Sequence, residues 1–308
     1  MNPKLGWTAC VLAVAVVFCA EASTTVLCST FPIYQIARNV ADGRGGIEIE
    51  LLLPASMGCP HHYALTPMEM RILSRADILV VNGLGMEEFL GAPLMEANPN
   101  VVVLDASKGI EGLIFGGVDG HGEEECDHEG QGHAHSGANP HLFASPRMSS
   151  LLAQNIAAGL AAADPDGVET YLSNASAYAG RMKTLADELS DLGQALKNRR
   201  IVQPHGAFDY FARDAGLEIV AVLQPHGGEP SAAEMLEVIR IAREKSAGAV
   251  FTEPQYSSKA GRTVAREAGI PAAMLDPGAS GPERAPLDYF DALVRRNMET
   301  LVETIGTK

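Results

Sequence analysis

The segment DPDGVETYLSNASAYAGRMKTLADELSDLGQAL, residues 164–196, carries the pattern of one long amphipathic helix. Its apolar residues recur at alternating steps of three and four, which is the spacing of one helix face. They occupy positions 168, 171, 175, 178, 182, 185, 189, 192 and 196. We predict one helix of roughly 30 residues, about 45 Å long, which matches the length of a two-lobed molecule. A dimeric coiled coil is the alternative, but the charge pairs that flank such a seam are lacking.

Strand and helix patterns alternate on both sides of this helix, which predicts parallel sheets covered by helices. The expected strands are 24–28, 47–53, 78–81 and 101–104, then 200–202, 218–223, 249–252 and 272–275. The expected helices are 32–40, 67–75, 86–97, 208–215, 231–245, 257–268 and one from about 287. The fold class is therefore α/β with two lobes, each a four-stranded parallel sheet flanked by helices, joined by one long backbone helix.

The N-terminus resembles a signal peptide. Residues 1–22 contain Lys4, an apolar run over 9–20 and the cleavage site Ala20-Glu21-Ala22. We expect export to the periplasm, because the run is too short to span a bilayer comfortably. A retained anchor and lipid attachment at Cys19 are the weaker alternatives; bulky Phe18 disfavours the second.

The rest of the chain divides at the long helix. Residues 23–163 are assigned to an N-terminal lobe, 164–198 to the connecting helix and 199–308 to a C-terminal lobe. A formal charge of −15 argues against binding to nucleic acid or anionic membranes and suits a protein that attracts cations.

Three cysteines remain after the signal peptide: Cys28, Cys59 and Cys126. In an oxidising compartment Cys28 and Cys59 form either a disulfide or two buried thiols, and the sequence leaves both alternatives open.

Residues 116–137 differ in composition from the rest of the chain. They contain six acidic residues and four histidines, with no Lys or Arg. A run without apolar surface predicts a flexible loop, and His and Cys within it predict weak metal sites. The expected donors are His121, Cys126, His128, His133 and His135. An ordinary solvated acidic loop is the alternative.

Four residues stand where ligands of an α/β protein gather. His61, His205 and Asp276 each follow an expected strand, and His141 precedes an expected helix. Ligands bind at the carboxyl ends of parallel strands, and two of the four residues fall in each half. Three imidazoles and one carboxylate suit zinc and close a tetrahedral shell. We predict that they hold one Zn²⁺ between the lobes. The ring nitrogen of each imidazole that does not bind the metal is expected to donate its N–H to a carbonyl or carboxylate.

Several residues near the expected site also have interpretations that do not involve metal binding. Asp276 precedes Pro277-Gly278 and is also a typical turn former. Glu253 is expected to support the site or the fold rather than to bind metal. His62 and His226 are expected to be bystanders.

Seven segments resemble the periplasmic zinc/manganese-binding proteins of metal ABC transporters. They are GCPHHYALTP (58–67), RADILVVNGLGME (75–87), NPH (139–141), HGAFDYF (205–211), GEPS (228–231), FTEPQ (251–255) and LDP (275–277). The resemblance covers essentially all of the mature chain. It implies two lobes bridged by one helix, with the metal between them.

The ligands of that family fall on His61, His141, His205 and Asp276. Members with His at the third position resemble zinc binders, whereas manganese members carry Glu there. Two departures concern the first ligand: the family usually has an acidic residue where Cys59 stands and Glu-Pro where Ala64-Leu65 stand.

The resemblance implies a monomeric carrier that captures Zn²⁺ and hands it to a membrane permease powered by a separate ATPase. It implies no enzyme activity. The alternatives are a manganese or iron carrier, a metal buffer or adhesin, and a zinc hydrolase with Glu253 as base. A hydrolase needs an open position on the metal, which four protein donors do not leave.

Overall fold

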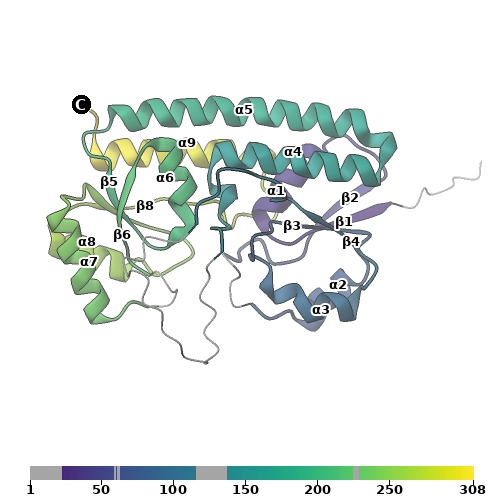
Figure 1. Cartoon of the computed structure of the whole chain (residues 1–308), viewed down its shortest axis with the longest axis horizontal. Helices are drawn as coiled ribbons and strands as arrows, with labels where there is room; N and C mark the ends of the chain where they lie inside the picture. The colour runs from purple at the N-terminus through teal and green to yellow at the C-terminus, as the bar shows by residue number, and fades with distance from the viewer. Residues whose placement is uncertain (1–22, 59, 61–62, 116–136, 225–228) are drawn as a thin grey trace, which may run out of the picture.

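The computed structural model describes residues 23–58, 60, 63–115, 137–224 and 229–308. Two four-stranded sheets form the centres of its two lobes (Figure 1), and all their strand pairs are parallel. The first has the order β2 (Ile47–Leu51), β1 (Thr24–Cys28), β3 (Ile78–Val81), β4 (Val102–Asp105). The second has the order β6 (Glu218–Val222), β5 (Arg200–Gln203), β7 (Ala249–Thr252), β8 (Ala272–Met274).

The two sheets share one topology, which confirms the predicted fold class. The strands β3 and β7 are buried along their whole length, as their continuous apolar runs require of strands with both faces covered. In each sheet the chain reverses its direction of winding between the two central strands. Such a switch point creates a crevice at the carboxyl ends of the strands, where ligands bind.

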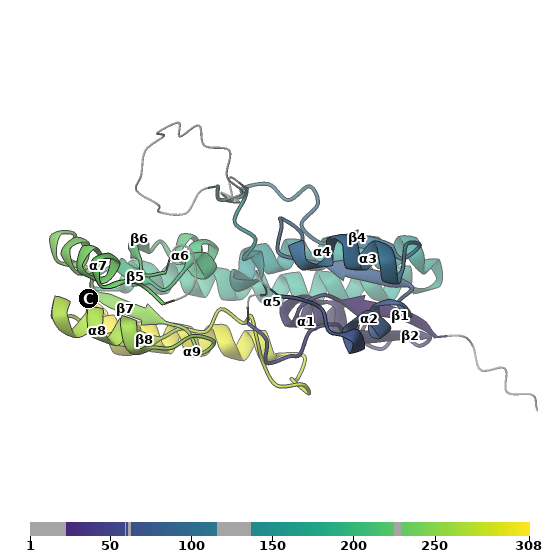
Figure 2. The same ribbon diagram turned by 90° about the horizontal axis from the view of Figure 1, so that it is seen from below.

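Helices connect the strands and cover the sheets (Figures 1 and 2). They are α1 (Phe31–Val40), α2 (Pro67–Leu73), α3 (Gly91–Ala97), α4 (Pro146–Ala163), α5 (Val168–Ala195), α6 (Asp209–Ala215), α7 (Ala232–Glu244), α8 (Lys259–Ala268) and α9 (Tyr289–Ile305). Short 3₁₀ segments are η1 (Glu88–Leu90), η2 (Leu142–Ala144), η3 (Pro165–Gly167) and η4 (Gly206–Phe208).

The predicted long helix is α5, and its 28 residues run past both sheets (Figure 1). Tyr171, Tyr178, Met182, Leu185 and Leu189 on its apolar face are buried. They belong to one hydrophobic core that also contains residues of the first lobe, such as those of β1 and α1, and of the second, such as those of α6 and α9. The lobes therefore share a core.

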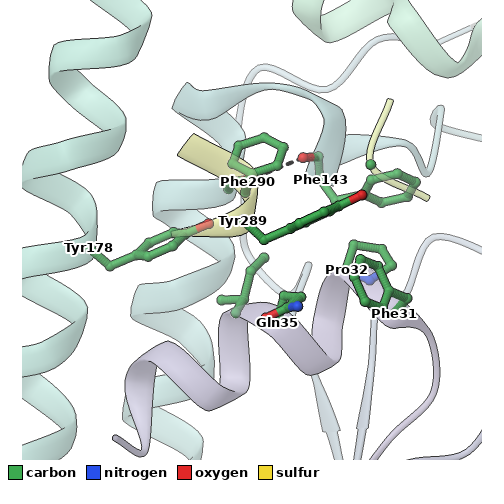
Figure 3. Close-up of a pocket in the computed structure, with 10 residues that line it drawn as sticks. Phe31, Pro32, Gln35, Phe143, Tyr178, Tyr289 and Phe290 are labelled. Carbon is green, nitrogen blue, oxygen red and sulfur yellow. Dashed lines mark hydrogen bonds between the residues drawn. The ribbon is translucent and has the colours of Figure 1, made fainter. Parts of the chain in front are cut away.

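A second contact between the lobes lies where the chain enters α9. Arg38 Nη1 donates to the Ala285 carbonyl (2.7 Å), and Asn39 Nδ2 donates to that of Leu287 (2.9 Å). The rings of Phe31 and Tyr289 meet edge to face, with centroids 5.6 Å apart. Figure 3 shows Tyr289 lying against α1, beside a cavity of about 20 Å³. Such a cavity holds about one water molecule, so the lobes are closely packed here.

The helix predicted over 86–97 is wrong in part. The structure has the 3₁₀ segment η1 followed by the short helix α3 from Gly91. Pro93 has no N–H to donate and is tolerated only in a first helical turn, so a helix cannot run through it. Upstream, Gly83, Leu84 and Gly85 all have positive φ and form a tight turn.

Cys28 is a free thiol and is fully buried, which raises its pKa. Of the two alternatives for this residue, the structure supports the buried thiol; Cys59 lies outside the described residues. In the described ranges no helix combines the length and the apolar character needed to cross a membrane.

Two glycines of α5 make the contact between α5 and α6 testable. At Gly193 an added Cβ would lie 1.6 Å from the Ala215 carbonyl oxygen, whereas at Gly180 it would meet nothing within 4 Å. We expect Gly193→Ala to lower the free energy of unfolding by about 1–3 kcal/mol or more, because backbone must move. Gly180→Ala should raise it by about 0.5–1 kcal/mol through helix propensity. Urea unfolding of both variants checks this, and equal midpoints would contradict the close approach.

Candidate metal centre

Three of the four predicted ligands lie in the described part of the chain. They are His141, His205 and Asp276; His61 lies outside it. The residues His62 and His226 and the loop donors also lie outside the described residues, the loop donors being His121, Cys126, His128, His133 and His135.

His205 follows β5 and precedes η4, at the carboxyl edge of the second sheet. Its Nδ1 lies 2.5 Å from Oε1 of Glu253, which follows β7 across the switch point. Its Nε2 is buried and has no hydrogen-bond partner among the described residues. A buried imidazole nitrogen without a partner is costly unless something binds to it.

His141 lies at the entry to η2 and α4, as predicted, and is buried. The side-chain oxygen of Asn139 is 2.8 Å from its Nδ1 and 2.9 Å from its backbone nitrogen. Both described histidines thus have Nδ1 close to an oxygen, although the contact of His205 with Glu253 lacks hydrogen-bond geometry among the described residues. The predicted use of the second ring nitrogen stays a prediction. In metal sites such contacts orient the ring and leave Nε2 for the metal.

The imidazoles of His141 and His205 lie side by side. Their ring centroids are 5.1 Å apart, with an angle of 79° between the ring planes. The ring of Tyr256 packs against that of His205, with the ring centroids 5.4 Å apart. Because His141 precedes α5 and His205 follows it, the chain brings together two imidazoles from its two halves.

Asp276 follows β8 and is half-buried. Its Oδ1 accepts a hydrogen bond from Gly278 N (2.9 Å), so the alternative role as turn former is observed. Its backbone is fixed by Asn297, which accepts from Asp276 N and donates to its carbonyl. One carboxylate oxygen is thereby committed to the turn.

Two carboxyl groups at this edge carry an electrostatic cost. Burial raises the pKa of Glu253, the neighbouring His205 lowers it, and Asp276 raises it further. Burial also raises the pKa of Asp276, against the lowering effects of Gly278 N–H and Gln255. A buried and a half-buried carboxyl group, each with a raised pKa, favour a cation beside them, since a positive charge offsets the cost of burying their charged forms.

The described residues do not contain a complete metal shell. No group of three or more His, Cys, Asp or Glu among them is arranged to hold an ion. The structure brings together His141 and His205 and places Glu253 against one of them; it does not join Asp276 to the pair as a third donor.

Sequence reasoning missed residues that support the site from a distance. Asn82 Nδ2 donates to the Pro140 carbonyl (2.9 Å) just before His141. Glu87 accepts from Ser29 Oγ and Asn82 N at the switch point of the first sheet. Asn139 lies in the NPH segment, two residues before the expected ligand His141. This proximity is the feature of the sequence that could have indicated its supporting role.

Two α/β lobes with a shared core, one long helix and paired imidazoles at the lobe boundary define a class of metal-binding, solute-binding proteins. The chain belongs to the family described as zinc-uptake complex component A, periplasmic, whose match covers residues 26–304.

Curated relatives agree with this assignment. The high-affinity zinc uptake system protein ZnuA of Bacillus subtilis is 29% identical over 289 residues, which cover 92% of this chain and 88% of that protein. The zinc-binding protein AdcA of Streptococcus pyogenes is 28% identical over 293 residues, covering 92% of this chain. The match spans only 56% of AdcA, so this chain corresponds to about half of that relative.

Solved structures share the fold. A crystal structure of a ZnuA deletion mutant with zinc bound has a TM-score of 0.74 at 27% identity, covering 93% of this chain and 99% of that one. The solute-binding protein FpvC of Pseudomonas aeruginosa in complex with Mn²⁺ has a TM-score of 0.76 at 25% identity, covering 92% and 98%.

The contact of Glu253 with His205 generates a prediction. Glu253→Gln keeps the side chain's shape but removes the charge that orients and polarises the imidazole. We expect zinc affinity to fall about 10–100-fold, the usual cost of losing such a partner. Chelator-competition titration measures it, with Glu244→Gln, on the exposed face of α7, as the control. Equal affinities for the two variants would contradict the supporting role.

Proposed function

We propose that this protein captures Zn²⁺ outside the cytoplasm and delivers it to an ABC-transporter permease. His61, His141, His205 and Asp276 are the proposed ligands. The observation that carries the proposal is the buried Nε2 of His205, unpartnered among the described residues, on a ring 5.1 Å from that of His141. A metal ion bound at this nitrogen would satisfy it.

The donor set decides between metals. Three imidazoles and one carboxylate make a borderline, nitrogen-rich set that suits zinc, while manganese prefers more oxygen donors. The names of ZnuA and AdcA support zinc. Manganese is the second candidate, because FpvC, with the same fold, was solved in complex with Mn²⁺. The hydrolase alternative finds no support in a family of uptake components.

Transport requires partners that this chain would meet outside the cytoplasm. The family description names a periplasmic component of an uptake complex, which supports a permease and an ATPase as partners. We propose that residues 1–22, which lie outside the described residues, direct export as a signal peptide. One relative, AdcA of Streptococcus pneumoniae, is named a lipoprotein, so retention by a lipid anchor is the alternative.

The acidic, histidine-rich segment is proposed to hold weaker, exchangeable zinc near the tight site. The described residues that flank it meet in the structure, where Phe115 and Ala138 form an antiparallel bridge and Asn139 N donates to the Ile114 carbonyl (2.7 Å). Removing residues 117–136 would therefore leave Gly116-Gly137 as a two-residue turn, which suits such a bridge. The ZnuA deletion mutant was solved with zinc bound, which supports zinc binding in the absence of a deleted segment.

The direct test is calorimetric titration with zinc of the mature chain, the chain lacking 117–136, and His205→Ala. We expect one tight site in the first two proteins and its loss in His205→Ala, since one of the four donors is gone. Elemental analysis of the purified protein identifies the bound metal.

Asp187→Asn, which removes an exposed carboxylate on α5, serves as the control and should bind like the parent. Competition between Zn²⁺ and Mn²⁺ for the same site separates the two candidates. Tight binding by His205→Ala would refute the proposed ligand set, and preference for Mn²⁺ would refute the proposed metal.

A further inference from the structure

The side-chain amide of Asn139 connects the two segments that carry the histidines. Its oxygen accepts from the backbone nitrogen of His141 (2.9 Å) and lies 2.8 Å from that ring's Nδ1. Its nitrogen donates to the carbonyl of Gly206, next to His205, and to Oδ2 of Asp209, both at 2.8 Å. One amide thus bridges the segment that carries His141 and the lobe that carries His205.

The orientation of this amide follows from its neighbours. Turned over, its oxygen would face the Gly206 carbonyl and the Asp209 carboxylate, and its NH₂ group would face the backbone N–H of His141. Both contacts would be repulsive, so one orientation satisfies every group. The oxygen that faces His141 only accepts, and the proton must therefore lie on Nδ1. The lone pair of the neutral ring is then on Nε2.

The C-terminal lobe holds the amide in place. Asp209 Oδ1 accepts from Gln203 Nε2 (2.6 Å), so both carboxylate oxygens are engaged. Tyr210 donates its hydroxyl proton to the Asn139 carbonyl (2.8 Å). At Gly206 an added Cβ would lie 3.1 Å from Asn139 Nδ2, so a residue without a side chain permits this approach.

We propose that Asn139 is a positioning residue: pinned by Asp209 of the C-terminal lobe, it fixes His141 in the tautomer whose Nε2 lone pair binds zinc. The inference rests on the proposed function, in which His141 is a ligand. It adds that zinc affinity depends on a polar contact between the lobes. If the contact is lost, the ring can turn or exchange its proton, and part of the binding energy goes to restoring the tautomer.

The experiment combines two readouts on Asn139→Ala and Asp209→Ala. Nitrogen-15 NMR of the metal-free protein, with the His141 signals assigned from His141→Gln, reports the tautomer. Chelator competition reports zinc affinity. We expect the Nδ1–H tautomer in the parent protein, a mixture of tautomers in both variants, and affinity reduced about 10–100-fold in Asn139→Ala.

A conservative variant separates this role from folding. In Asp209→Asn the new amide oxygen can still accept from Asn139, and Gln203 can turn its unpartnered Oε1 toward the new NH₂ group. We expect the zinc affinity of Asp209→Asn to lie within about threefold of that of the parent protein. Asn139 requires an oxygen that accepts its hydrogen bond, and the negative charge of Asp209 is not needed for this. Asn174→Ala is the matched control. Its amide also donates to two carbonyls, of Val40 and Asp42, but at the amino-terminal edge of the first sheet.

The outcomes are distinct. Loss of affinity in His141→Ala, with parental affinity and a parental tautomer in Asn139→Ala, overturns the positioning role and leaves the proposed function standing. Parental affinity in His141→Ala overturns the proposed ligand set, and the positioning role with it. An Nε2–H tautomer in the metal-free parent protein overturns the orientation argument directly.

Discussion

The buried apolar face of α5 holds the two lobes together. Its tyrosines, leucines and methionine belong to one core that contains residues of both lobes. Separating the lobes would expose that apolar surface to water, at roughly 25 cal/mol for each Å². The contacts of the 285–289 segment with α1 join the lobes at a further place. The lobes are thus held as one body, and side chains at their boundary keep a fixed geometry.

A fixed boundary suits a site assembled from distant parts of the chain. His141 and His205 are separated in sequence by the whole of α5, yet their rings are neighbours. Nδ1 of each ring faces an oxygen, of Asn139 and of Glu253 respectively, and His141 is buried while the His205 side chain is 13% exposed, so both rings have little freedom to turn. Preorganised donors reduce the cost of ordering the site when the metal arrives. A carrier of this design gains affinity from its scaffold as well as from its ligands.

The sequence predicted the architecture well because the evidence for it is local and repeated. The structure contains both the long helix that the three-four spacing predicted and the alternating strands and helices of the two parallel sheets. The helix over 86–97 failed where Pro93 overrides an apolar pattern. The pairing of Asn139 with Asp209 could not be foreseen, because it joins residues 70 positions apart through a lobe contact that no spacing encodes. His141 and His205 could be predicted as site residues because both lie next to the end of a strand or helix. That their rings are neighbours could be seen only in the structure.

The X-ray absorption fine structure of bound zinc shows whether imidazoles from both lobes bind one zinc ion. The chain lacking residues 117–136, loaded with one equivalent of zinc, removes the contribution of the loop. We expect four nitrogen or oxygen donors at about 2.0–2.1 Å, with the outer-shell scattering of three imidazoles. A sulfur donor at about 2.3 Å, or the signal of fewer than two imidazoles, would contradict it.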